Sequence, residues 1–168
     1  MILNPHNLHW LNEQTETDLC AHGAVSVRIG DRQLATPDDG DWCVSAAAIY
    51  LLRSLTTTHT YDSPVGEQLI PCCGFAMHPQ DDSADIFIMG CNRGVDWEVH
   101  HEGERVRLRT YEGEEEIIAL AEWRRIVFGF ADAVAGFYAA SAPKQPYDET
   151  DAQGFAAMQA EWSRRRDA

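Results

Sequence analysis

A cysteine at or near the start of a predicted helix is the first residue in this chain that could take part in catalysis. Cys43 lies just before an apolar stretch at helical spacing, and the N-terminal end of a helix lowers the pKa of a thiol. His100, on a predicted strand, could act as the base that produces the thiolate. The carboxylates of Asp38, Asp39 and Asp41 oppose this role, because neighbouring negative charge raises the pKa of a thiol. We therefore favour a core cysteine and predict no catalytic residue.

The order of a helical cysteine followed by a strand histidine resembles the arrangement in papain-like hydrolases. The resemblance covers about ten residues around Cys43 and one histidine. It implies a thiol-dependent hydrolase in which Cys43 attacks the substrate and His100 is its base. This is the alternative hypothesis, since a place on a predicted hairpin also explains His100 without catalysis.

Soft ligands elsewhere in the chain raise a second alternative, a zinc site that supports hydrolysis. Its ligands would be the thiols and imidazole of Cys20, His22, Cys72 and Cys73. The chain lacks the C-x2-C pair of compact zinc sites, and two adjacent cysteines seldom bind one ion together. Buried cysteines explain the same residues, so we predict neither a metal nor a cofactor.

The cysteines and the start of the chain also bear on the compartment. The five cysteines include the adjacent pair Cys72-Cys73, which does not suit a simple disulfide framework. The first residues lack the basic and apolar regions of a secretory signal. No apolar run approaches the ~18–20 residues that a membrane span requires. We therefore expect reduced thiols and a cytoplasmic protein.

Four acidic clusters dominate the charge of the chain. They are Asp38–Asp41, Asp81–Asp85, Glu112–Glu116 and Asp148–Asp151. With 27 acids against 13 lysines and arginines, the formal net charge is −14. Charge of this sign repels nucleic acid and anionic membranes and attracts basic partners. The last two clusters fall at predicted helix starts, where acids are favourable, but the first two have no such explanation.

A small acidic chain without a signal or a catalytic motif resembles, in type, the immunity proteins that bacteria pair with secreted toxins. The chain has no Walker loop, no H-E-x-x-H and no G-x-S-x-G. The resemblance implies a non-catalytic protein that occludes a basic, nuclease-like toxin by charge complementarity and a few buried aromatic contacts. The acids expected to contact such a partner are Asp38, Asp39, Asp41, Asp81, Asp82 and Asp85.

Two hairpins are predicted among the elements that must position these residues. Alternating apolar residues across 24–35 predict the first. The segment 95–109 predicts the second, turned at Glu102-Gly103. This turn places apolar side chains on one face and pairs Glu98 with Arg107 on the other.

Three helices are predicted from apolar stripes. The first covers about 42–58, and Ser45 could cap it. The second and longest covers 114–140, with acids at its start and two glycines inside that allow either close packing or a local loss of stability. The third covers 151–165 and ends in three arginines.

Together these elements predict one α+β domain over residues 1–168: antiparallel hairpins or sheet, one early helix and two C-terminal helices. Residues 1–23 are expected to be irregular, and 141–150 to connect the last two helices. The continuous apolar run Asp85–Gly90 predicts a strand buried on both faces. A further option is a structural module that forms homo-oligomers through its two C-terminal helices.

Overall fold

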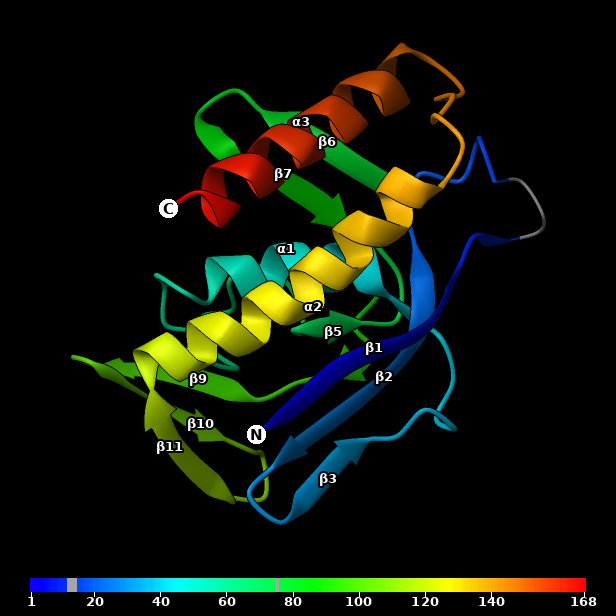
Figure 1. The fold of residues 1–168 in the computed structure, drawn as a ribbon. Helices are drawn as coiled ribbons and strands as arrows, with labels where there is room; N and C mark the ends of the chain where they lie inside the picture. Colours follow the sequence, from blue (N-terminus) through cyan, green and yellow to red (C-terminus); the bar gives the residue numbers. More distant parts are fainter. Residues whose placement is uncertain (12–14, 75) are drawn as a thin grey trace.

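Antiparallel sheets and three helices follow one another along the chain in the predicted order (Figure 1). The computed structural model describes residues 1–11, 15–74 and 76–168.

The strands of the largest sheet are β1 (Ile2–His9), β2 (His22–Ile29), β3 (Arg32–Ala35) and β4 (Trp42–Cys43). The second sheet contains β9 (Glu98–Glu102), β10 (Arg105–Arg109) and β11 (Glu115–Ala119). Two shorter ladders pair β5 (Ile70–Pro71) with β8 (Gly94–Val95) and β6 (Ala76–Gln80) with β7 (Ser83–Met89). The helices are α1 (Val44–Arg53), α2 (Leu120–Ala140) and α3 (Glu149–Arg166). The predicted α+β class is confirmed.

Helix α1 forms the centre of the molecule, and all of its residues are buried. Helix α2 packs on α1 and β1, and α3 packs on β6, β7 and α1 (Figure 1). A helix enclosed in this way needs small or apolar side chains around its whole circumference. The run Ala46-Ala47-Ala48-Ile49 supplies them.

The two short ladders share one register. The first pairs Ile70 with Val95, and the second pairs Ala76 with Met89. From Ile70 to Ala76 the chain advances by six residues, and from Met89 to Val95 it also advances by six residues, so the pairing keeps the same register in both ladders. β5 with β6, and β7 with β8, are therefore the two sides of one antiparallel ribbon that is interrupted at its middle.

The prediction of an irregular segment 1–23 is wrong for residues 2–9 and 22–23, which form strands, whereas the described residues 10, 11 and 15–21 lie in no α-helix or strand. Ile2–His9 forms β1, which pairs with β2 from Ile2 opposite Arg28 to His9 opposite His22. Residues 12–14 of the segment lie outside the described part of the chain. Polar side chains hide the alternation of this strand, and its backbone hydrogen bonds come from a partner strand that local sequence does not reveal.

The predicted 95–109 hairpin forms, but its register differs. β9 and β10 turn at Gly103-Glu104, so Glu98 faces Arg109 and not Arg107. Gly103, with a φ of 63°, occupies the first turn position, where type II′ hairpins need glycine. Each residue of β9 therefore faces a residue of β10 two positions later than predicted. A shift of two residues keeps every side chain on the same face of the sheet, so the apolar side chains remain on the buried face.

The strand predicted at Asp85–Gly90 is buried on one face only. Ile86 and Ile88 of β7 are 2% and 4% exposed, whereas Phe87 and Met89 are 49% and 50% exposed. β6 and β7 form a two-stranded hairpin with α3 packed against it. The face away from the helix is left in solvent, so this strand alternates despite its continuous apolar sequence.

Two predicted helix boundaries are corrected. Helix α2 begins at Leu120, because Glu115–Ala119 forms β11 and pairs with β10. Of the acids in the Glu112–Glu116 cluster, Glu115 and Glu116 therefore lie on this strand, and Glu112 and Glu114 precede it. Helix α1 ends at Arg53, and Ser45 is not its cap: the Ser45 hydroxyl accepts the N–H of Ala21 at 2.7 Å.

Helix α3 confirms the last predicted helix and approaches β6 unusually closely. Its first turn is capped by Asp148, whose carboxylate accepts the N–H of Asp151 at 2.9 Å. At Gly154 an added Cβ would lie 1.9 Å from the carbonyl oxygen of Met77, so only glycine permits this contact. The two glycines of α2, Gly129 and Gly136, face open space and thus serve no close packing.

We expect Gly154→Ala to lower the free energy of unfolding by about 1–3 kcal/mol, because its methyl group must push α3 away from β6. Gly129→Ala and Gly136→Ala are the matched controls. Each should raise the free energy of unfolding by about 0.5–1 kcal/mol, since alanine is the better helix former. Urea denaturation of the three variants measures the difference, and equal effects at all three positions would contradict the close contact.

Candidate functional site

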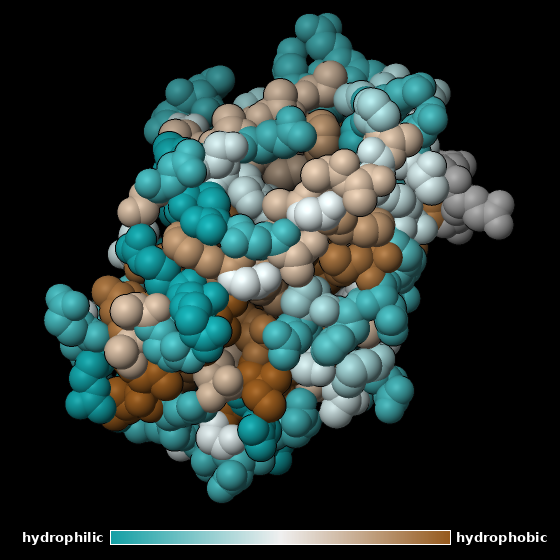
Figure 2. All heavy atoms as spheres, in the orientation of Figure 1, coloured by the Kyte–Doolittle hydropathy of each residue, from teal (hydrophilic) through white to brown (hydrophobic). Residues whose placement is uncertain are grey.

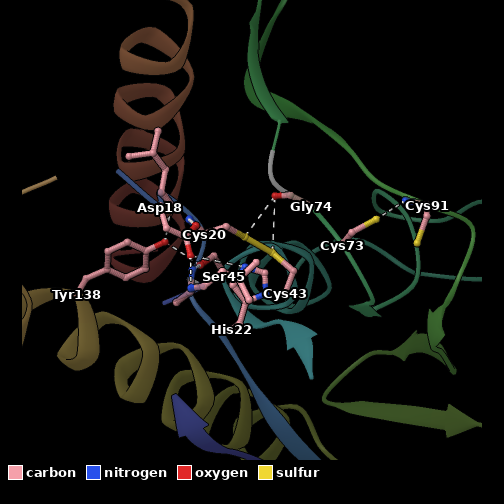
Figure 3. Close-up of a disulfide and its surroundings, with 12 residues drawn as sticks. Asp18, Cys20, His22, Cys43, Ser45, Cys73, Gly74, Cys91 and Tyr138 are labelled. Carbon is pink, nitrogen blue, oxygen red and sulfur yellow. Dashed lines mark hydrogen bonds and ion pairs between the residues drawn. A yellow bond between two sulfur atoms is a disulfide. The ribbon is translucent and has the colours of Figure 1, made fainter. Parts of the chain in front are cut away.

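The structure does not support Cys43 as a nucleophile. Cys43 is fully buried and forms a disulfide with Cys20 (Figure 3). His100 lies on β9, where its Nε2 is 3.1 Å from the carboxylate of Glu98. A sulfur already bonded to sulfur is not a thiolate, so Cys43 and His100 do not form the couple that a papain-like mechanism requires. The expectation of reduced thiols is wrong for Cys20 and Cys43.

The four residues of the zinc alternative are also divided among different roles. Cys20 is bonded in the disulfide, and the Nε2 of His22 lies 3.9 Å from the carboxylate of Asp18. Cys72 and Cys73 remain thiols. In the described part of the chain, no group of three or more His, Cys, Asp and Glu side chains is placed to hold a metal ion.

The two acidic clusters predicted to contact a partner lie at different ends of the molecule. The loop after β3 that carries Asp38, Asp39 and Asp41 is at the lower right of Figure 1, and the β6–β7 turn is at the upper left. In the first cluster, Asp39 accepts hydrogen bonds from Thr36, and Asp41 lies 3.6 Å from the imidazole of His9. One compact contact patch therefore cannot contain both clusters.

The β6–β7 hairpin exposes a group of side chains on the face away from α3. We call this group the hairpin face; it consists of Ala76, His78, Phe87 and Met89. Ala76 pairs with Met89 across the strands, and the rings of His78 and Phe87 stack with their centroids 6.4 Å apart. Single exposed apolar residues are ordinary on a protein surface, but a contiguous group marks a candidate binding site.

Acidic residues lie at the tip of the same hairpin. Asp81 and Asp82 are exposed in its turn, and no base of the described residues pairs with either of them. Asp85 instead accepts hydrogen bonds from Arg164 and Arg165, each at 2.6 Å. Partial burial would raise the pKa of Asp85, but these two guanidinium groups lower it. Of the three acids predicted here, only Asp81 and Asp82 remain available to a partner.

A buried ion pair holds this hairpin against the helices. Arg53, the last residue of α1, donates from Nε and Nη2 to the two carboxylate oxygens of Glu161 on α3, at 2.7 and 2.9 Å. The two side chains are 9% and 0% exposed. Burial would lower the pKa of Arg53, but the hydrogen bonds and the charge of Glu161 raise it. Arg165 donates a further hydrogen bond to Glu161 at 2.7 Å.

The same ion pair closes the edge of β7. The N–H of Ile86 donates to Oε2 of Glu161 at 2.7 Å, and Nη2 of Arg53 donates to the Ile86 carbonyl at 2.7 Å. The carboxylate and the guanidinium thus satisfy backbone groups that a further strand would otherwise pair. At Ile86 the edge of β7 is therefore not open to a further strand, whereas the hairpin face remains exposed.

A groove between α2 and α3 is a separate surface. Its volume is about 530 Å³, and its lining includes Tyr138, Phe155 and Trp162. Figure 2 shows apolar side chains along the line between these helices. The Tyr138 hydroxyl donates to the Leu19 carbonyl at 2.7 Å, and the Lys144 ammonium lies over the Trp10 ring, 2.9 Å from its centroid. These polar groups at the groove are thus used within the chain.

Comparisons with family models, with curated proteins and with solved structures found no match to this chain. The function must therefore be inferred from the chemistry of its own surface. Of the helices in the described residues, none is both long and apolar enough to cross a membrane.

The sequence does not single out Arg53 and Glu161, although it contains a weak signal for each. Arg53 directly follows two leucines in the apolar stripe of the first helix. Glu161 follows Met158 by three residues and Gly154 by seven, which places all three on one face of α3. A charge at a core position needs a partner, but helical spacing cannot say which residue provides it.

We expect Glu161→Leu to lower the free energy of unfolding by about 3–5 kcal/mol, because it leaves the Arg53 guanidinium buried and unpaired. The double variant Arg53→Met with Glu161→Leu should regain part of that loss, since no buried charge is left over. The exposed pair Arg125 and Glu122 is the matched control, and Glu122→Leu should change stability little. Urea denaturation tests this; a single variant as stable as the control would refute the buried network.

Stability should also fall as the pH is lowered toward the titration range of histidine. Burial lowers the pKa of His22, although the charges of Asp18 and Asp41 oppose this. The unfolded chain then takes up a proton before the folded chain does, so the free energy of unfolding decreases as the pH falls below about 6.5. His22→Gln should flatten this dependence between about pH 7.5 and pH 5.5 in urea titrations. An unchanged slope in the variant would exclude His22 as the cause.

Proposed function

We propose that this chain is a non-catalytic acidic binding protein that occludes a basic protein partner with its β6–β7 hairpin. The observation that supports this most is the half-exposed pair Phe87 and Met89 on the hairpin face, in the same hairpin as the exposed carboxylates of Asp81 and Asp82. An apolar centre beside a polar rim is typical of protein interfaces. The net charge of −14 favours a basic partner.

The two kinds of side chain would act at different stages of binding. Asp81 and Asp82 would steer a basic partner toward the hairpin and raise the association rate. Phe87 and Met89 would be buried on contact and slow dissociation. Because the edge of β7 is closed at Ile86, binding through the face is favoured over addition of a strand.

Within this proposal the partner is a nuclease-like toxin, as for the immunity proteins that the chain resembles in type. A toxin that binds phosphate presents basic groups, and the acids of the hairpin turn can neutralise them. Neither nucleic acid nor a membrane is then a partner of this chain, and the cytoplasm is where it would act. The loop that carries Asp38, Asp39 and Asp41 lies at the other end of the molecule and is not part of this contact.

A second copy of the chain is the alternative partner, bound through the C-terminal helices. The apolar groove between α2 and α3, with Phe155 and Trp162 in its lining, supports this possibility. A homo-oligomer formed there would leave the hairpin face accessible, since that face points away from α3.

Co-expression with the basic C-terminal domain of a secreted protein encoded beside this gene tests the proposal. We expect the wild-type chain to relieve the growth arrest that this domain causes, and the double variant Asp81→Lys with Asp82→Lys to fail. With purified proteins, the charge reversal should slow association and raise Kd at least about tenfold, which corresponds to 1.4 kcal/mol. Phe87→Ala should mainly accelerate dissociation.

Asp38→Lys is the matched control, because it reverses an exposed acid at the other end of the molecule. It should still relieve the arrest. If Asp38→Lys and the hairpin variants relieve the arrest equally well, the hairpin is not the binding surface. If the wild-type chain gives no relief, the proposed function is wrong.

A further inference from the structure

Cys20, Cys43, Cys73 and Cys91 lie around the interruption between the β5–β8 ladder and the β6–β7 ladder (Figure 3). On one side, the carbonyl oxygen of Gly74 lies 3.5 Å from the sulfur of Cys20 and 3.6 Å from that of Cys43. On the other side, Cys73 and Cys91 approach each other from the two strands of the ribbon. One side thus holds a disulfide, and the other holds thiols at short range.

The backbone geometry places the thiols of Cys73 and Cys91 within reach of each other. The N–H of Cys91 donates to the sulfur of Cys73 at 2.9 Å. The sulfur of Cys91 is three bonds from that nitrogen, so a rotation about one side-chain bond can bring the two sulfurs together. The N–H of Cys72 donates to the Arg93 carbonyl at 2.9 Å and holds the strands in register. The register of the two ladders offsets Cys73 from Cys91 by one residue, so the contact across the interruption, and not a paired position, brings the two thiols near each other.

We propose that Cys73 and Cys91 form a dithiol site that reacts with low-molecular-weight disulfides, such as oxidised glutathione, to give an intramolecular disulfide. The Cys91 thiolate attacks one sulfur of the reagent, forms a mixed disulfide and releases one glutathione thiolate. The Cys73 thiolate then attacks the Cys91 sulfur, forms the Cys73–Cys91 bond and releases the second. The two protein thiols lose two protons and two electrons, and the reagent gains both to become two reduced glutathione molecules.

Cys91 attacks first because its thiolate is the better stabilised. The hydrogen bond from Cys73 lowers the pKa of Cys91, with further help from the backbone at Arg93. The same hydrogen bond raises the pKa of Cys73. Cys72 is exposed, and the pKa of its thiol is raised like that of Cys73. The geometry favours Cys73 as the second thiol, because its sulfur is the one that accepts the N–H of Cys91.

The new bond would close the β6–β7 hairpin at its open end. Cys73 precedes β6 and Cys91 follows β7, so the disulfide joins the two ends of the hairpin that carries the hairpin face. A bond that closes this loop restrains the opened forms of the hairpin. This inference does not depend on the proposed function, since it concerns the chemistry of the thiols themselves.

Treatment of the purified protein with oxidised glutathione tests the inference. After alkylation of the remaining thiols, peptide mass spectrometry should find a Cys73–Cys91 linkage and an alkylated Cys72. Amide exchange at Met77 and Ile88, which pair within the hairpin, should slow several-fold on oxidation, while exchange in α2 stays unchanged.

Serine variants show which cysteine forms the mixed disulfide and which one completes the intramolecular bond. Cys73→Ser should stop at the mixed disulfide on Cys91, and Cys91→Ser should give no intramolecular bond. Cys72→Ser is the control and should form the disulfide as the wild type does. Three alkylated thiols after oxidation of the wild type, or a linkage to Cys72 in place of Cys73, would overturn the inference; peptide mapping decides this even if a variant fails to fold.

Discussion

The buried ion pair between Arg53 and Glu161 is the interaction on which the arrangement of the hairpin depends. A two-stranded hairpin buries little surface and is marginal by itself. Here Ile86 of β7 exchanges hydrogen bonds with both charged groups, and the two groups bond to each other. Each charge is satisfied only when α1, α3 and β7 are all in place, because a buried charge without its partner is costly. The network therefore couples the position of the hairpin to the core.

This coupling also decides which part of the hairpin meets the solvent. Helix α3 covers the inner face, and the ion pair covers the edge of β7 at Ile86. The outer face and the acidic turn remain in solvent, and they combine the exposed Phe87 and Met89 with the exposed carboxylates of Asp81 and Asp82. The base of the hairpin is the interruption in the ribbon, where the thiols of Cys73 and Cys91 lie. The proposed binding surface and the proposed dithiol site thus belong to one structural unit, with the acidic turn at one end and the thiols at the other.

The candidate site could be predicted only in part. The acids Asp81 and Asp82 stand out as a cluster without internal bases, and no base in the part of the chain that the structure describes pairs with them. Asp85 belongs to the same cluster, yet two arginines from the far end of the chain neutralise it. The apolar half of the surface was hidden, because a continuous apolar run such as Ile86–Met89 does not tell whether one face or two are covered.

The sequence by itself determined the α+β class, the early 24–35 hairpin and the last helix, because periodicity, turn residues and caps act over a few neighbouring positions. It also determined which side of the 95–109 hairpin is apolar, although not its register. Only the tertiary structure decided that Glu115–Ala119 is a strand, that Cys20 bonds to Cys43, and that Arg53 pairs with Glu161. Each of these depends on a partner distant in the chain, and local spacing carries no information about which distant residue folding will bring into contact.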